Sequence, residues 1–166
     1  MENYNPFIKT AITRKTMSSP TKYLLKHNLL KSSILDYGCG KGKDVEELKL
    51  LGFDIKGYDK FNDMYNTKLN KYETIICNYV FNVIYDLKEH YKTVEKLKKM
   101  SKNVYISLRN DKKSIKNDWK YIKNQDCYKT SKNSYQRFYT NESIKKYFGK
   151  VKIINENNTY ILLKLL

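Results

Sequence analysis

The sequence predicts an α/β fold with a mainly parallel β-sheet and an antiparallel hairpin at its C-terminal end. Three observations support this prediction. Short apolar stretches of strand length alternate with stretches in which apolar residues recur at helical spacing. A cluster of glycines follows the first apolar stretch, as in turns that join a parallel strand to a helix. The stretch 150–166, KVKIINENNTYILLKLL, holds two strand-like runs separated by a polar turn. Alternating strands and helices favour a parallel sheet, to which the hairpin adds an antiparallel edge.

The N-terminal half contains the first strands and helices of this pattern. Ser19 and Pro20 are typical of an N-cap and a first helical residue, which predicts a helix over Thr21–Asn28. Apolar positions and turn residues then predict a strand at Ile34–Leu35, a helix marked by Val45, Leu48 and Leu51, a strand within Phe53–Asp59, a strand over Thr74–Tyr79, and an amphipathic helix over Leu87–Met100.

The C-terminal half adds one more strand, two helices and the hairpin. A strand is predicted over Asn103–Leu108. The spacing of Ile115, Trp119 and Ile122 suggests a helix, and a further helix over Thr140–Phe148 is closed by Gly149. The hairpin turns around Glu156–Asn158.

The glycine turn, residues 38–42, places backbone N–H groups where side chains cannot crowd a ligand. A P-loop needs Ser or Thr after Gly-Lys, whereas Asp44 follows Lys43 here. The dinucleotide fingerprint G-x-G-x-x-G needs a glycine where Lys43 stands. The spacing that is present is D-x-G-x-G-x-G, and it begins at Asp36.

A carboxylate directly ahead of the glycine turn favours a cationic ligand. Asp36 would repel a phosphate and attract a cation, and S-adenosylmethionine carries an ammonium and a sulfonium but no phosphate. A second acid, Asp59, ends the next strand, where nucleotide-binding α/β folds place a carboxylate against ribose hydroxyls. A tight connection and a helix cap are the structural alternatives, but the order and spacing together favour cofactor binding.

ILDYGCGKG at 34–42 and GYDK at 57–60 together resemble the cofactor-binding half of class I S-adenosylmethionine-dependent methyltransferases. The resemblance implies a Rossmann-like fold and S-adenosyl-L-methionine as cofactor. Such folds usually have a helix and a strand after the second strand, whereas FNDMYNTKLN at 61–70 is too short for both, so we expect one strand to be missing. Phe61 would then replace the usual adenine contact. The predicted cofactor-binding residues are Asp36, Tyr37, Gly38, Gly40, Gly42, Asp59, Lys60, Phe61 and Asn78.

A closer resemblance extends through most of the chain. Stretches 9–25 (KTAITRKTMSSPTKYLL), 36–45 (DYGCGKGKDV), 78–86 (NYVFNVIYD) and 134–140 (SYQRFYT) resemble the methyltransferases associated with DNA phosphorothioation gene clusters. The substrate of that family is poorly defined, so the resemblance implies methyl transfer more firmly than it implies DNA.

The acceptor-positioning residues follow from the same stretches. Amino methyltransferases of adenine or cytosine commonly place an Asp or Asn before Pro-Pro and an aromatic residue, whereas Asn78 is followed by Tyr79 without prolines. This stretch could equally be a cofactor-binding strand end. Because methyl transfer to an amine needs mainly alignment and exclusion of water, we predict a positioning role for Arg14, Asn78, Tyr79, Asn82, Gln136 and Tyr139. Arg14 and Arg137 are expected near the pocket mouth, with a surface salt bridge as the alternative for Arg14.

The charge of the chain suggests the partner. There are 33 Lys and Arg against 17 Asp and Glu, a net charge of +16, which attracts polyanions. Nucleic acid, DNA or RNA, is therefore the predicted partner and acceptor. An AT-rich coding sequence is the alternative origin of the many lysines. Two other functions stay open: methyl transfer to a small molecule or protein, and non-catalytic binding of S-adenosylmethionine by a regulatory protein.

The composition predicts one domain over residues 1–166, with residues 1–30 as a segment and helix ahead of the first strand. No apolar run has the length of a membrane span and the N-terminus lacks a signal sequence, so we expect a cytoplasmic location, from a bacterial, viral or mobile-element source, and no membrane partner. Cys39, Cys77 and Cys127 are odd in number and not spaced for zinc, which argues against disulfides and a metal site.

Overall fold

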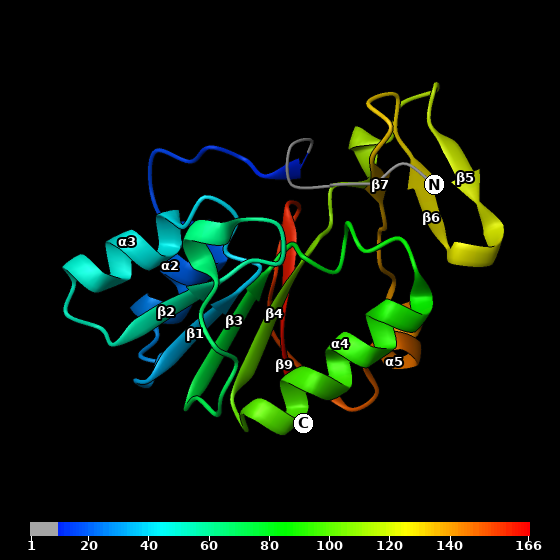
Figure 1. Ribbon diagram of the computed structural model, residues 1–166. Helices are drawn as coiled ribbons and strands as arrows, with labels where there is room; N and C mark the ends of the chain where they lie inside the picture. Colours follow the sequence, from blue (N-terminus) through cyan, green and yellow to red (C-terminus); the bar gives the residue numbers. More distant parts are fainter. Residues whose placement is uncertain (1–9) are drawn as a thin grey trace.

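The computed structural model of the chain describes residues 10–166, so residues 1–9 of the predicted N-terminal segment lie outside the described part. Its centre is a six-stranded sheet in the order β2-β1-β3-β4-β9-β8 (Figure 1). The strands β2, β1, β3 and β4 are parallel to one another. β9 is antiparallel to both of its neighbours, β4 and β8. The strands are β1 (Ile34–Tyr37), β2 (Ile55–Tyr58), β3 (Thr74–Asn78), β4 (Val104–Arg109), β8 (Val151–Glu156) and β9 (Tyr160–Leu165). This arrangement confirms the predicted mainly parallel sheet with a C-terminal hairpin.

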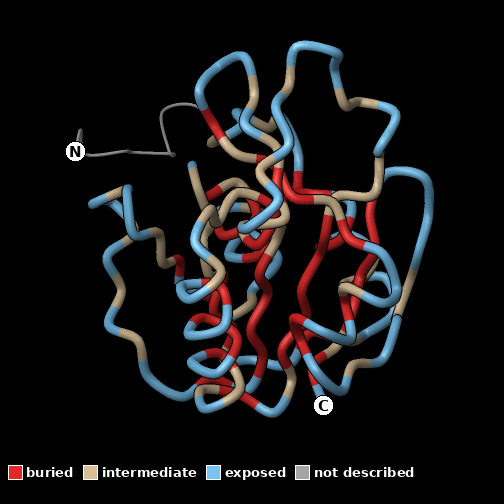
Figure 2. The backbone as a smooth tube through the Cα atoms, turned by 90° about the vertical axis from the view of Figure 1, so that its right-hand side faces the viewer, coloured by how far each residue is buried: buried red, intermediate tan, exposed pale blue. Residues whose placement is uncertain are grey.

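Helices cover both faces of the sheet (Figure 1). α2 (Ser19–Lys26) and α3 (Lys43–Leu50) pack on one face, and α4 (Leu87–Met100) and α5 (Asn141–Phe148) pack on the other. In β3, Ile75 joins the core under α4 and α5, whereas Ile76 joins the core under α2 and α3, because successive side chains of a strand point to opposite faces. The buried residues therefore concentrate along the central strands (Figure 2). Within residues 10–166, no helix is both long and apolar enough to cross a membrane.

Most predicted elements lie at or near their predicted positions. α4 has the predicted bounds, and α5 has Thr140 as its N-cap and Gly149 as its C-cap. α2 starts earlier than predicted, because Ser18 rather than Ser19 is the N-cap and accepts a hydrogen bond from the backbone N–H of Thr21. Between β2 and β3 the chain forms only the short 3₁₀ helix η1 (Asp63–Tyr65) and an isolated bridge. The strand that related folds usually have at this point is missing, as predicted.

The predicted helix around Ile115–Ile122 is wrong. That region belongs to an insert, residues 112–136, which forms a small antiparallel sheet in the order β5-β6-β7. Tyr121 and Tyr128 face each other across the first two strands with ring centroids 5.1 Å apart, a cross-strand aromatic pair that favours strand over helix. The elements of the insert are η2 (Lys112–Ser114), β5 (Lys120–Ile122), η3 (Lys123–Gln125), β6 (Cys127–Lys129) and β7 (Tyr135–Gln136).

Candidate active site

A cavity of about 1120 Å³ opens at the carboxyl ends of the parallel strands. Its walls come from the loops after β1, β2, β3 and β4, from the N-terminal segment around residues 10–14, and from the insert. Ligands of open α/β sheets bind at this edge of the sheet. In Figure 1 the insert lies at the upper right, apart from the six-stranded sheet, so the two sheets face the site from different sides.

The glycine turn forms one end of the cavity. Gly38, Gly40 and Gly42 have φ values of 75°, 58° and 76°, in the left-handed region that favours glycine. A Cβ built on Gly40 would meet nothing nearer than the Cβ of Ala11 at 3.9 Å, so its backbone is open to a ligand. Gly38 also lines the cavity. Gly42 lies outside the cavity wall, because the ring of Tyr65 covers it, and it serves as the N-cap of α3.

Asp59, directly after β2, braces the glycine turn from the side. One carboxylate oxygen accepts the N–H of Gly40 at 2.9 Å, and the other accepts the N–H of Phe61 at 2.9 Å. Each oxygen keeps a second lone pair that a ligand hydroxyl could use. Lys60 and Phe61 line the cavity beside it, and Lys60 forms an ion pair with Glu89 at 3.1 Å.

Asp36 lies behind the glycine turn rather than in the main cavity. It lines a small adjoining pocket, whereas Tyr37, the last residue of β1, lines the main cavity. Burial, reinforced by Asp44 and opposed by Arg14, raises the pKa of Asp36 well above its usual value. Asp36 is buried beside this small pocket and does not line the main cavity, so its predicted attraction to a cationic ligand stays a prediction.

A buried network ties the N-terminal segment to the glycine turn. The carboxylate of Asp44 accepts hydrogen bonds from the backbone N–H of Ser18 at 2.7 Å, the hydroxyls of Ser18 and Thr21 at 2.6 and 2.7 Å, and the amide of Asn78 at 3.1 Å. The Oδ1 of Asn78 accepts from the hydroxyl of Ser107 at 2.9 Å. Asn78 lines the cavity, and its Oδ1 keeps a second lone pair beside the bond from Ser107, so its predicted contact with an acceptor amine stays a prediction.

Arg14 and Tyr79 meet on the cavity wall. The guanidinium carbon of Arg14 lies 5.7 Å from the centre of the Tyr79 ring, a cation–π contact. Tyr79 follows β3 with φ of 62°, which is uncommon for a residue with a side chain. Burial, opposed by Arg14, raises the pKa of Tyr79 to about 12, so its hydroxyl stays protonated at neutral pH. Both residues line the cavity, and their positioning role stays a prediction.

The side chains of Asn82 and Tyr139, which are also predicted positioning residues, form hydrogen bonds to the backbone of the protein. Asn82 donates its amide N–H to the carbonyl of Arg137 at 2.6 Å, and its Oδ1 accepts the N–H of Arg109 at 2.9 Å. Tyr139 is buried and lies outside the cavity wall, and its hydroxyl donates to the carbonyl of Phe81 at 2.8 Å. Asn82 and Tyr139 thus hold the loop after β3 in place. Asn82 also lines the cavity, so its predicted contact with an acceptor stays a prediction, whereas Tyr139 does not line it.

Arg137 is fully buried, so its predicted position at the pocket mouth is wrong. Its guanidinium fixes the loop after β3 against the insert. The N–H groups donate, over distances of 2.8 to 3.5 Å, to the backbone carbonyls of Phe81, Ile84, Tyr85, Gln125 and Asp126.

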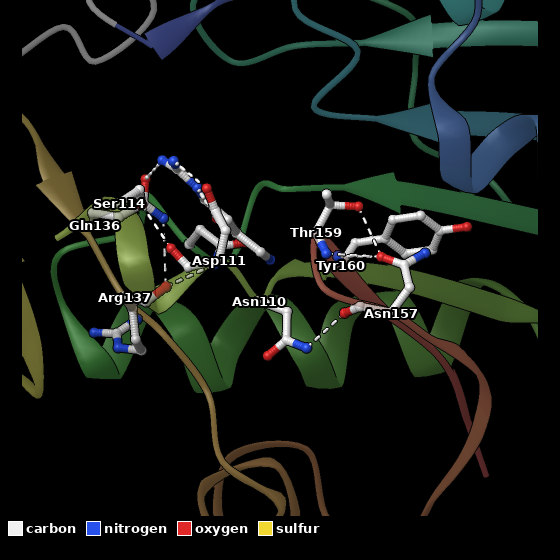
Figure 3. A network of polar contacts seen from close by, with 10 residues as sticks. Asn110, Asp111, Ser114, Gln136, Arg137, Asn157, Thr159 and Tyr160 are labelled. Atoms are coloured by element: carbon white, nitrogen blue, oxygen red, sulfur yellow. Dashed lines mark hydrogen bonds and ion pairs between the residues drawn. The ribbon is translucent and has the colours of Figure 1, made fainter.

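An ion pair at the end of β4 was missed by sequence reasoning. The guanidinium of Arg109 binds both carboxylate oxygens of Asp111, and its Nη1 also lies 3.5 Å from Oε1 of Gln136. All three residues line the cavity, and Figure 3 shows Asp111 and Gln136 side by side. Burial acts to raise the pKa of Asp111, but hydrogen bonding from Arg109 lowers it below its usual value. An arginine at a strand end, rare in this lysine-rich chain, was the available signal.

The geometry around Gly40 fits S-adenosylmethionine. The open backbone at Gly40 admits a ligand, and the free lone pairs of Asp59 suit ribose hydroxyls. The exposed ring of Phe61 lies beside them on the cavity wall, where it can contact a base. Within residues 10–166, no group of three or more His, Cys, Asp or Glu side chains is arranged to hold a metal ion.

A family model described as a methyltransferase domain matches residues 10–151, whereas the sequence matches none of the curated proteins. The chain is similar to the solved structure of an S-adenosylmethionine-dependent methyltransferase from Clostridium acetobutylicum, with 16% identity, 98% of this chain and 96% of that chain covered, and a TM-score of 0.55. A methyltransferase from Bacteroides fragilis in complex with S-adenosyl-L-homocysteine has 16% identity, coverage of 92% and 78%, and a TM-score of 0.58. The 1,6-didemethyltoxoflavin-N1-methyltransferase from Burkholderia thailandensis has 10% identity, coverage of 87% and 74%, and a TM-score of 0.62.

Proposed function

The chain belongs to the methyltransferase domain family and is an S-adenosylmethionine-dependent methyltransferase, and we propose that its methyl acceptor is a small molecule bound between the glycine turn and the insert. The observation that carries this proposal is the cavity itself. Its volume of about 1120 Å³ is slightly above the usual range of roughly 300 to 1,000 Å³ for one small ligand. The site therefore has room for the cofactor and a small acceptor together.

The residues of the cavity would divide the work between the two ligands. Bound S-adenosylmethionine supplies an electrophilic methyl group. Asp59 would accept hydrogen bonds from the ribose hydroxyls of the cofactor. The glycine turn would let the cofactor lie directly against the protein backbone, because no side chain stands between them. Arg14 and Tyr79 lie on the wall where they could orient the nucleophile of the acceptor. The insert and the N-terminal segment would exclude water from the reacting atoms.

The Burkholderia enzyme supports a small acceptor by analogy. Its structure contains 1,6-didemethyltoxoflavin together with S-adenosylhomocysteine, so a chain of this fold can enclose both ligands. The likeness to the present chain concerns the fold alone, and the acceptor is argued from the cavity.

Nucleic acid is the second candidate acceptor, and the net charge of +16 is the observation that favours it. The resemblance to methyltransferases of phosphorothioation gene clusters points the same way. The comparisons add no support for that association. A nucleic acid acceptor also predicts that log affinity falls linearly with log salt, by about 0.7 to 0.9 for each phosphate contact.

The test is methylation with labelled S-adenosylmethionine of three substrate pools: duplex DNA, total RNA and the small-molecule filtrate of a cell extract. We expect label in the small-molecule pool, and the Gly40→Val variant, whose added side chain would fill the cofactor end, serves as the inactive control. Label in DNA or RNA alone, with the salt dependence above, would overturn the small-molecule proposal and favour the second candidate.

A further inference from the structure

The charged side chains of the cavity are unevenly distributed. At the end formed by β1 and β2, the acids Asp59 and Glu89 line the wall, and Lys60 is paired with Glu89. At the end formed by β4 and the insert, Asp111 is neutralised by Arg109. Lys116 and Lys132 line that same end. Lys41 also lines the first end, which is therefore balanced, and Asp86 lines the wall as well. Lys116 and Lys132 leave the second end with an excess of positive charge even when Asp86 is counted there.

The cations of the second end have no partners among the described residues. Neither the ammonium of Lys116 nor that of Lys132 forms an ion pair or a hydrogen bond within residues 10–166. Asp118 and Asp126, the carboxylates nearest to them along the chain, form no ion pair with either lysine, and Asp126 accepts the hydroxyls of Tyr121 and Tyr147. A ligand with a negative charge would therefore meet cations that are not already neutralised.

The same end offers an unused hydrogen-bond donor. The indole Nε1 of Trp119 is buried and has no partner among the described residues, although Trp119 lines the cavity. A buried N–H without a partner is unfavourable, so such a group calls for water or a ligand. An indole N–H donates and cannot accept, which again favours an acceptor atom on the ligand.

Aromatic rings complete this end. Tyr85 and Tyr135 line the cavity and pack against each other with ring centroids 4.3 Å apart, and Trp119 of the insert also lines it. Flat apolar rings favour a flat ligand, which can stack on them. The unpaired lysines, the indole N–H and the aromatic rings together favour a flat, negatively charged ligand at this end of the cavity.

We propose that the end of the cavity between β4 and the insert is the acceptor subsite, and that it takes a small planar molecule bearing a carboxylate or phosphate group. This inference rests on the proposed function, since it names the class of small molecule that would accept the methyl group. Lys116 and Lys132 attract the anionic group, the Trp119 indole donates to it, and the planar part packs against the outer side of the Tyr85–Tyr135 pair.

The experiment uses three probes of nearly the same shape and different charge: benzoate, benzamide and benzamidine. The chain has one tryptophan, so the two-dimensional ¹⁵N–¹H NMR spectrum contains a single indole N–H peak that reports on this end of the cavity. We expect benzoate to shift that peak and to bind at least about tenfold more tightly than benzamidine, because each of the two lysines favours the anion. Benzamide should lie between them.

The matched variants are Lys116→Gln with Lys132→Gln, and Lys88→Gln with Lys92→Gln as control, since Lys88 and Lys92 are exposed on α4 and do not line the cavity. The first pair should bring the benzoate-to-benzamidine ratio close to one, and the control pair should leave it unchanged. Equal or tighter binding of benzamidine by the native chain, a ratio that survives Lys116→Gln with Lys132→Gln, or benzoate binding that leaves the indole peak in place would each overturn the subsite.

Two further measurements separate the possible failures. Calorimetry with S-adenosylhomocysteine tests the proposed function, because a chain that does not bind it would not be the proposed enzyme. If S-adenosylhomocysteine binds and the probes show no charge preference, the acceptor subsite alone is wrong. A short single-stranded oligonucleotide that displaces benzoate and loses affinity in Lys116→Gln with Lys132→Gln would also overturn the small-molecule class, in favour of nucleic acid.

Discussion

The two ends of the cavity are built in different ways. The cofactor end consists of short neighbouring stretches, and its bracing hydrogen bond joins Gly40 to Asp59, 19 residues apart. The end beside the insert, which we propose as the acceptor subsite, depends on contacts such as that between Asn82 and Arg137, 55 residues apart. Buried polar side chains brace both ends, with the Asp44 network behind the glycine turn and Arg137 behind the insert, but at the first end the backbone of Gly40 is itself open to a ligand. Substitutions at the cofactor end should therefore weaken ligand binding, and substitutions behind the acceptor end should lower stability.

The largest effect is expected for Arg137→Met. The substitution keeps much of the side-chain length but leaves five backbone carbonyls without their donor, which should lower the free energy of unfolding by about 3 to 5 kcal/mol. Urea denaturation measures this change. Arg14→Met is the matched control, because Arg14 is half-buried and contacts a ring. A loss below about 1 kcal/mol for Arg137→Met would show that the acceptor end does not depend on this guanidinium.

Gly40→Val should affect the opposite end. The valine side chain would occupy the open space beside the turn, and we expect the affinity for S-adenosylhomocysteine to fall more than a hundredfold, or about 3 kcal/mol. Gly52→Val is the control, since Gly52 also has a positive φ, of 86°, and has no atom within 4 Å of a built Cβ. Both variants carry the backbone strain, so unchanged binding by Gly40→Val would mean that the turn is only a connection.

Asp59→Ala should weaken the binding of S-adenosylhomocysteine by about ten- to a hundredfold, or roughly 1.5 to 3 kcal/mol. It removes the proposed ribose contact together with the hydrogen bonds to the N–H groups of Gly40 and Phe61. Asp59→Asn keeps one carbonyl oxygen and should lose less. Asp63→Ala, at an exposed position in η1, is the control, and calorimetry gives the affinities. Equal affinity in all these variants would remove Asp59 from the site.

The smallest effect concerns pH. Burial, with the nearby Arg137, lowers the pKa of His90 to about 3 from an ordinary value of 6.5. Below pH 6.5 the unfolded chain therefore takes up a proton on His90 that the folded chain excludes. The free energy of unfolding is unaffected by this proton above pH 6.5 and falls progressively as the pH is lowered toward 3. Between pH 6.5 and about 5.5 the native chain should lose about 1 kcal/mol more than His90→Gln. Denaturation at both pH values measures it, and parallel losses would contradict a neutral buried His90.

The strands, most helices and the glycine turn could be predicted because their signals are local. Gly38 and Gly40 sit at positive φ, where a residue with a side chain is strained, and the apolar runs of β1 and β3 are buried on both faces of the sheet. The insert could not be predicted in the same way. Ile115, Trp119 and Ile122 have helical spacing, but strand pairing of Tyr121 with Tyr128 decides the local structure.

The sequence by itself determined the kind of residue at each site position, and the tertiary structure decided whether that residue was available. Asp59 and Tyr79 line the cavity, whereas Arg137 and Tyr139 lie outside its wall, and Asn82, which lines it, forms hydrogen bonds to the protein's own backbone as they do. The physical reason is that a buried polar group must find a hydrogen-bond partner. Arg137 and Tyr139 donate to carbonyls of the loop after β3, and Asn82 of that loop donates to the carbonyl of Arg137. These partners lie more than 50 residues apart in the chain and come close only when the sheet and the insert are folded.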